Sequence, residues 1–164
     1  MDRVPEPADG TERKLLLGWL SFHRNALEAN CAGLTDDELT ARSAMPSSLS
    51  LQGLVRHLTE MEHFYLVHAI SGVRGEFAWI YCTDDNPDAD LDLLHPGEAQ
   101  ASLQRWRDVQ TQADTLLLKG KLTDKGPGNG RSLRWNLMKV IGEYARHNGH
   151  ADLIRERIDG SVGE

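Results

Sequence analysis

The most informative stretch of this sequence reads Glu143-Tyr144-Ala145-Arg146-His147-Asn148-Gly149-His150. Within the helix that we predict around it, Glu143 and His147 are four residues apart and lie on one face, one turn from each other. Apolar residues share that face: Val140, Ala151, Ile154 and Ile158. We therefore expect the carboxylate and the imidazole to point toward a core, where an unpaired polar group is costly and needs a partner.

His57 is the third member of a candidate site. It lies on the apolar side of an earlier predicted helix. Zinc accepts imidazole nitrogens and carboxylate oxygens, and its catalytic sites keep three protein ligands and one open position. We therefore interpret His57, Glu143 and His147 as candidate ligands of one divalent metal. Each residue alone has an ordinary interpretation, as a packed core histidine or as a surface pair worth only about 0.2–0.5 kcal/mol.

Four amphipathic patterns predict four long helices, over about residues 12–30, 50–71, 96–118 and 132–159. Ser50 is the expected N-cap of the second, and Gly160 stands at the expected end of the fourth. Pro96 is predicted in the first turn of the third helix. Long connections separate the helices. The sequence therefore predicts an all-α four-helix bundle, forming a single domain over residues 1–164.

Composition excludes several classes of protein. The chain has a net charge of −7 and no long stripe of Lys and Arg, which argues against nucleic acid as a partner. It has no apolar run of the roughly 20 residues that span a membrane, and its first residues lack a signal-peptide core. We therefore expect a cytoplasmic protein. Its two cysteines, Cys31 and Cys82, are expected to be reduced, and Cys82 is a weak candidate nucleophile.

Two further residues have more than one interpretation. His150 follows His147 by three residues and is either an alternative ligand or a group just outside the metal site. Glu60 follows His57 by three residues and either accepts a hydrogen bond from a ligand imidazole or is simply solvated. Both are also candidates for a catalytic general base.

Two segments carry a family resemblance. They are Ser50-Leu51-Gln52-Gly53-Leu54-Val55-Arg56-His57-Leu58, followed by Glu60, and Glu143-Tyr144-Ala145-Arg146-His147-Asn148-Gly149-His150-Ala151-Asp152-Leu153. Over about residues 10 to 160, the chain resembles the DinB-like superfamily of metal-binding four-helix bundles. It also resembles the N-terminal domain of mycothiol-dependent maleylpyruvate isomerases.

The resemblance implies a ligand set and a chemistry. Carried over from the isomerase branch, the ligands are His57, Glu143 and His147, and the metal is zinc or nickel. The superfamily includes transferases and isomerases that use low-molecular-weight thiols such as mycothiol or bacillithiol. The isomerase has an additional C-terminal domain that this sequence does not contain, so we do not expect maleylpyruvate isomerisation itself.

We expect a metal-dependent S-transferase or a related enzyme, which joins a small thiol to an electrophilic substrate. Trp79 and Tyr81, in the connection after the second helix, are candidates for covering the substrate, and Arg155 for meeting an anionic group on it. One alternative is a hydrolase in which the metal activates water. Another is a non-catalytic metal-binding or stress-related bundle. An exposed helix face would also be compatible with a homodimer.

Overall fold

The second predicted helix is one helical run whose geometry changes partway. The computed structural model describes residues 4–163. In it, α3 (Leu51–Glu62) begins after Ser50, whose hydroxyl accepts the Gly53 N–H at 3.1 Å, as the sequence predicted. The run continues as the π-helix η1 (His63–His68) and as α4 (Ala69–Ser71). A π-turn inserts extra backbone into a helix and is frequent near functional sites.

The terminal helix α7 (Leu133–Asp159) is the longest element. Ser132 caps its start by accepting the Trp135 N–H at 3.2 Å. Gly160 ends it in the left-handed conformation, with φ of +79°. That conformation carries no steric penalty for glycine, which explains why the helix stops where the sequence predicted.

Helix α1 (Glu12–Cys31) agrees with its predicted range, whereas α6 (Ala99–Leu117) begins later than expected. The prediction that Pro96 opens α6 was wrong. Gly97 has φ of +87°, and the Glu98 N–H bonds to the carbonyl of His95, so Pro96 lies in a turn. A left-handed residue directly after Pro96 prevents a helix from starting there.

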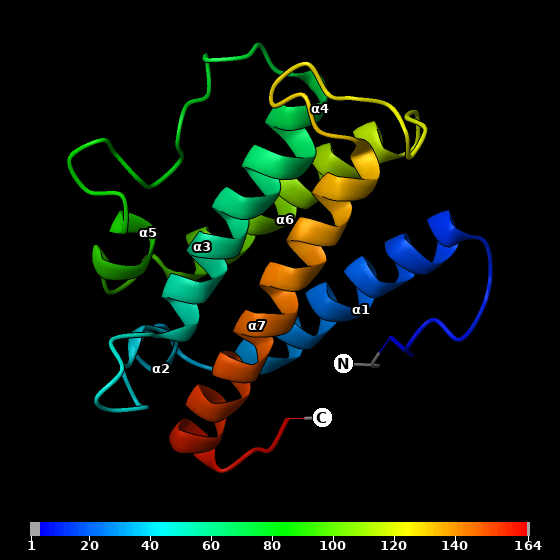
Figure 1. The fold of residues 1–164 in the computed structure, drawn as a ribbon. Coiled ribbons are helices and arrows are strands. Elements are labelled where there is room, and N and C mark those ends of the chain that lie inside the picture. Colours follow the sequence, from blue (N-terminus) through cyan, green and yellow to red (C-terminus); the bar gives the residue numbers. More distant parts are fainter. Residues whose placement is uncertain (1–3, 164) are drawn as a thin grey trace.

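Two short helices interrupt the connections. The first, α2 (Asp36–Thr40), starts with a capping box in which Thr35 and Glu38 exchange side-chain and backbone hydrogen bonds. The second, α5 (Ala89–Asp92), lies in the long acidic connection between α4 and α6. Figure 1 shows α5 beside α3, and the two helices are in contact.

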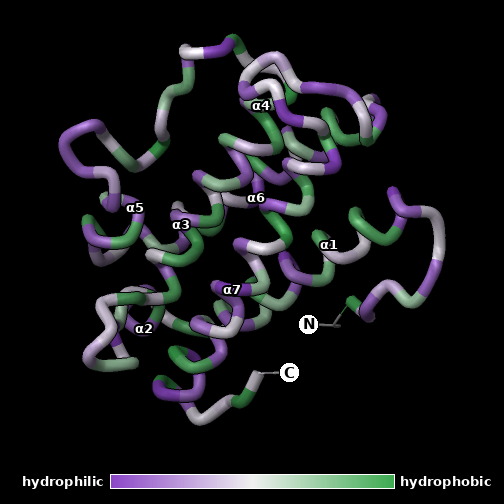
Figure 2. Tube along the Cα trace, in the orientation of Figure 1, coloured by the Kyte–Doolittle hydropathy of each residue, from purple (hydrophilic) through white to green (hydrophobic). Residues whose placement is uncertain are grey.

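The four long helical elements form a bundle, as predicted. Helix α7 packs against α1 and against α3, and α3 also packs against α6 (Figure 1). Between residues 4 and 163 the structure has no β-strand, only one isolated bridge between Lys125 and Ser132. Along each helix, apolar and polar residues alternate in short groups (Figure 2), the pattern of helices with one buried face. No helix in the described part of the chain is long and apolar enough to cross a membrane.

The bundle core contains a buried polar network. Tyr144 donates its hydroxyl proton to Glu62 at 2.5 Å and accepts the indole N–H of Trp106 at 2.7 Å. Arg24 reaches the same carboxylate, with its Nε 2.8 Å from Glu62 Oε1. Glu62, Trp106 and Tyr144 are completely buried. Because buried polar groups need partners, this network ties α1, α3, α6 and α7 to one another.

Candidate metal centre

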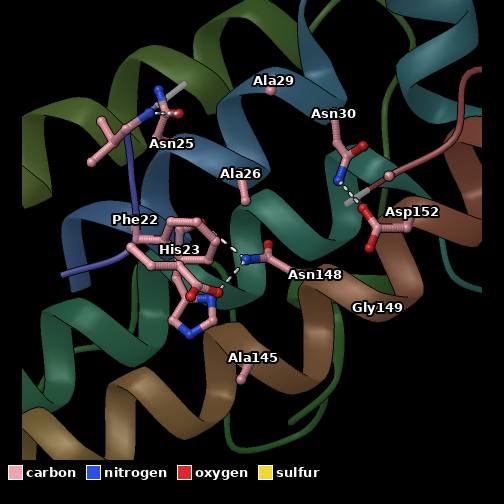
Figure 3. Close-up of a pocket in the computed structure, with 13 residues that line it drawn as sticks. Phe22, His23, Asn25, Ala26, Ala29, Asn30, Ala145, Asn148, Gly149 and Asp152 are labelled. Carbon is pink, nitrogen blue, oxygen red and sulfur yellow. Dashed lines mark hydrogen bonds between the residues drawn. The ribbon is translucent and has the colours of Figure 1, made fainter. Parts of the chain in front are cut away.

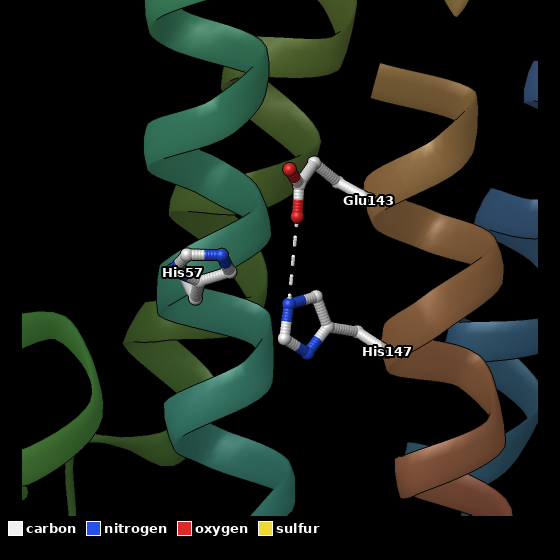
Figure 4. Close-up of side chains that lie close together, drawn as sticks. All are labelled: His57, Glu143 and His147. Carbon is white, nitrogen blue, oxygen red and sulfur yellow. Dashed lines mark ion pairs between the residues drawn. The ribbon is translucent and has the colours of Figure 1, made fainter. Parts of the chain in front are cut away.

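Helices α3 and α7 bring the three predicted ligands together. One ligand atom from each of His57, Glu143 and His147 lies within 4.8 Å of the others. His147 Nε2 and Glu143 Oε2 are 3.6 Å apart, and the rings of His57 and His147 have centroids 4.7 Å apart. Figure 4 shows the three side chains pointing toward one another across the gap between the two helices. Among residues 4–163, they make up the one grouping of this kind.

His57 has a partner that the sequence analysis did not find. Its Nδ1 lies 2.8 Å from Oδ2 of Asp90 on α5, and Asp90 is only 3% exposed. A carboxylate can only accept hydrogen bonds, so Nδ1 is the nitrogen that carries the proton. In the neutral form of the ring, the lone pair then lies on Nε2, where a metal could bind it.

His147 has a comparable contact on α7. Its Nδ1 lies 3.3 Å from Nδ1 of His150, while its Nε2 faces Glu143. Burial, together with the neighbouring imidazoles of His57 and His150, lowers the pKa of His147 to about 4. His147 is therefore neutral at pH 7, the form that binds metals. His150 touches the ring of one ligand and does not belong to the group of three.

Glu143 is ionised at neutral pH. Partial burial raises its pKa, but the ammonium of Lys139, one turn earlier on α7, together with the nearby imidazoles of His57 and His147, outweighs burial, and the pKa is lowered. Lys139 forms an ion pair with Oε1 of Glu143, whereas Oε2 faces His147. The two oxygens thus have different partners, and one remains directed at the candidate centre.

The donor set fits a divalent metal. It offers two imidazoles, each with a contact at Nδ1, and one carboxylate. Zinc takes these donor types, and three protein ligands leave a position for water or a substrate. Nickel accepts the same donors, so the ligand set does not choose between the two ions.

Glu60 does not accept a hydrogen bond from a ligand imidazole. Its Oε1 instead accepts backbone N–H groups from the connection that follows α4, those of Ile80 at 2.8 Å, Tyr81 at 2.5 Å and Cys82 at 3.2 Å. Burial raises the pKa of Glu60, against the opposite effect of these three donors. The carboxylate at the second ring nitrogen of His57 belongs to Asp90 and not, as the spacing suggested, to Glu60. The other aspartates of the acidic run around Asp90 are exposed, and no local periodicity in the sequence distinguishes this buried carboxylate from them.

The candidate substrate-binding residues lie in different settings. Trp79 is 45% exposed and packs edge-on against Phe77, whereas Tyr81 lies under the guanidinium of Arg56, 4.2 Å from the ring centroid. Arg155 contacts residues at the C-terminal ends of α1 and α7. It donates to the carbonyls of Asn30 at 3.0 Å and Ala32 at 2.8 Å, and it pairs with Asp159 at 2.6 Å.

Both cysteines are free and buried. Burial raises the pKa of Cys31 to about 12 and that of Cys82 to about 11. Since the thiolate is the reactive form, neither residue suits the role of a nucleophile at neutral pH.

A separate cavity of about 380 Å³ lies between α1 and α7 (Figure 3). His23 and Asn148 meet in its wall, where the amide nitrogen of Asn148 donates to the carbonyl of His23 at 3.0 Å. Asn30 donates to Asp152 at 2.7 Å on another side. None of the three candidate ligands lines this cavity.

The fold and the His-Glu-His grouping define an all-α helical bundle with a candidate metal centre between two of its helices. The family model described as mycothiol-S-transferase matches residues 15–160, and the chain belongs to this family. The family is DinB-like, which confirms the resemblance seen in the sequence. No curated protein and no solved structure matches the chain.

Proposed function

We propose that this protein is a metal-dependent S-transferase that joins a low-molecular-weight thiol of the mycothiol class to an electrophilic small molecule. The observation that carries the proposal is the convergence of His57, Glu143 and His147 within 4.8 Å, in a chain of the mycothiol-S-transferase family. These three residues would hold one divalent metal, with zinc as the first candidate and nickel as the second. When bound, such a metal lowers the pKa of a thiol at its open position, so that thiolate forms near neutral pH.

The chain itself supplies the arrangement around that position. Asp90 and His150 contact the rings of the two histidines, and Lys139 holds one oxygen of Glu143. His150 is half-buried beside His147 and is the candidate acceptor for the proton that the thiol releases. Trp79 has the exposure needed to contact a substrate, whereas the two terminal nitrogens of Arg155 already bond to backbone carbonyls and to Asp159, so Arg155 is the weaker candidate for binding an anion.

The test measures conjugate formation with purified, zinc-loaded protein, mycothiol and an electrophile such as 1-chloro-2,4-dinitrobenzene. We expect product to form faster than the spontaneous reaction, with a rate that depends on the thiol. Glu143→Ala should abolish the acceleration, because it removes a ligand. Glu156→Ala is the matched control, since Glu156 lies on the same helix but is exposed.

The outcomes separate the proposal from its rivals. A metal-dependent reaction with water that needs no thiol would replace the transferase by a hydrolase. Bound metal without turnover across a panel of thiols and electrophiles would favour a non-catalytic metal-binding bundle. In either case the S-transferase assignment fails.

A further inference from the structure

We infer that Asp90 is a positioning residue, which holds the imidazole of His57 in the tautomer that presents Nε2 to Glu143 and His147. The inference rests on the proposed metal site and adds to it the residue that orients one ligand. Its direct support is the 2.8 Å contact between Asp90 Oδ2 and His57 Nδ1. Without an acceptor at Nδ1, the proton of a neutral imidazole is free to lie on Nε2, where it would block the lone pair.

Asp90 is itself fixed in place by α3. Arg56, the residue before His57, donates to the carbonyls of Leu93 at 2.5 Å and Ala89 at 3.1 Å, which flank Asp90 in the chain. Helix α5 is therefore fastened to the same turn of α3 that carries the ligand. These bonds keep the backbone of Asp90 beside the ring of His57.

A glycine permits this close approach. At Gly53, one turn before His57, an added Cβ would lie 3.2 Å from the carbonyl oxygen of Leu91 and 3.4 Å from its Cα. The backbone of α5 thus rests on a position of α3 that has no side chain. The absence of a Cβ at Gly53 lets Asp90 come within hydrogen-bonding distance of His57.

The other end of the connection is fastened as well. The carboxylate of Glu60, one turn after Arg56, accepts hydrogen bonds from the backbone N–H groups of residues 80–82. Three neighbouring polar residues of α3 therefore reach the connection that carries Asp90: Arg56, His57 and Glu60. Such outer partners fix the ring orientation and tautomer of metal-binding histidines, and their loss commonly weakens metal affinity about 10–100-fold.

The experiment compares Asp90→Ala and Asp90→Asn with wild type. Asp92→Asn is the matched control, because Asp92 is exposed on the same short helix. Long-range proton–nitrogen NMR on metal-free protein labelled with ¹⁵N-histidine, at pH 8, reports which nitrogen of His57 carries the proton. Zinc affinity is then measured by competition with a chromophoric chelator.

We expect His57 to be protonated on Nδ1 in wild type and in Asp92→Asn. In Asp90→Ala, the Nε2-protonated form should appear, and zinc should bind about 10–100-fold more weakly. Asp90→Asn should recover part of both properties, because its amide oxygen still accepts from Nδ1. This rescue separates positioning from a general loss of structure, which both substitutions would share.

Two results would overturn the inference: a proton on Nε2 in wild type, or an unchanged tautomer and zinc affinity in Asp90→Ala. Its failure is distinguishable from failure of the proposed function. The NMR measurement needs neither metal nor turnover, so an inactive protein with the expected tautomers would overturn the transferase assignment alone.

Discussion

The imidazole rings of His57 and His147 lie 4.7 Å apart, centroid to centroid, with an angle of 62° between their planes. They belong to different helices, and no hydrogen bond joins them directly in the described part of the chain. The two imidazoles and the carboxylate of Glu143 beside them are donor types that suit a divalent cation.

Removing either histidine should therefore remove the metal. We expect about one zinc or nickel per chain in wild type, measured by elemental mass spectrometry on untagged protein. His57→Ala and His147→Ala should lose it at neutral pH, with the helical circular dichroism largely retained. His150→Ala should keep its metal, because His150 lies outside the group of three. Equal metal content in all variants would remove the basis for the site, and loss with His150→Ala would make it a fourth ligand.

The two acidic partners of Arg24 should differ greatly in their contribution to stability. Glu62 is completely buried, whereas the side chain of Asp114 is 59% exposed. Glu62→Ala leaves a buried guanidinium without its main partner and should lower the free energy of unfolding by about 3–5 kcal/mol. Asp114→Ala should cost about 0–1 kcal/mol, since exposed ion pairs are weak. Urea denaturation measures both, and similar losses would contradict this account of the core.

Glu60 should control the order of the connection that follows α4. Glu60→Ala deprives three backbone N–H groups of their acceptor. We expect amide hydrogen exchange at Ile80, Tyr81 and Cys82 to accelerate at least about fivefold, because an unsatisfied buried donor costs about 1–3 kcal/mol. Glu76→Ala, an exposed change in the same connection, is the control and should leave exchange unchanged. Unaltered protection in Glu60→Ala would mean that the N–H groups have other acceptors.

The buried thiol of Cys31 should make stability depend on pH in the alkaline range. Its pKa is about 12 in the folded protein, raised by burial from an ordinary value of 9.0. The unfolded chain therefore releases this proton first as the pH rises, and stability is lost from about pH 9 toward pH 12. The loss should approach about 1.4 kcal/mol per pH unit in that window. Urea denaturation at pH 8 and pH 10.5 should show a smaller loss in Cys31→Ala than in wild type, and an equal loss would contradict the prediction.

Much of the fold could be read from local sequence signals. Ser50, Ser132 and Gly160 mark helix ends because caps and left-handed stops depend on a few adjacent residues. The prediction for Pro96 was wrong for a reason that is also local. Gly97 adopts a positive φ, and the preference of proline for the first turn of a helix takes no account of the next residue. The π-turn over His63–His68 had no recognisable signature, because apolar periodicity hardly distinguishes a π-turn from an α-turn.

The candidate site, too, could be predicted from the sequence only in part. Spacing placed Glu143 and His147 on one helical face, and the apolar stripe of α3 placed His57 inward. The partners of these residues were harder to predict. Asp90 is 33 residues from His57 in the chain, and only packing of α5 on α3 brings the two together. The spacing of Glu60 from His57 was compatible with a hydrogen bond to the imidazole, yet its carboxylate accepts the backbone N–H groups of residues 80–82 instead.

The sequence by itself determined the helices and the inward direction of the three candidate ligands, because helical periodicity is a local property of the chain. The tertiary structure decided which helices meet and which carboxylate contacts Nδ1 of His57. Those features depend on contacts between segments distant in sequence. Hydrogen bonds act over about 3 Å, and the spacing of residues along the chain does not encode which distant groups come that close.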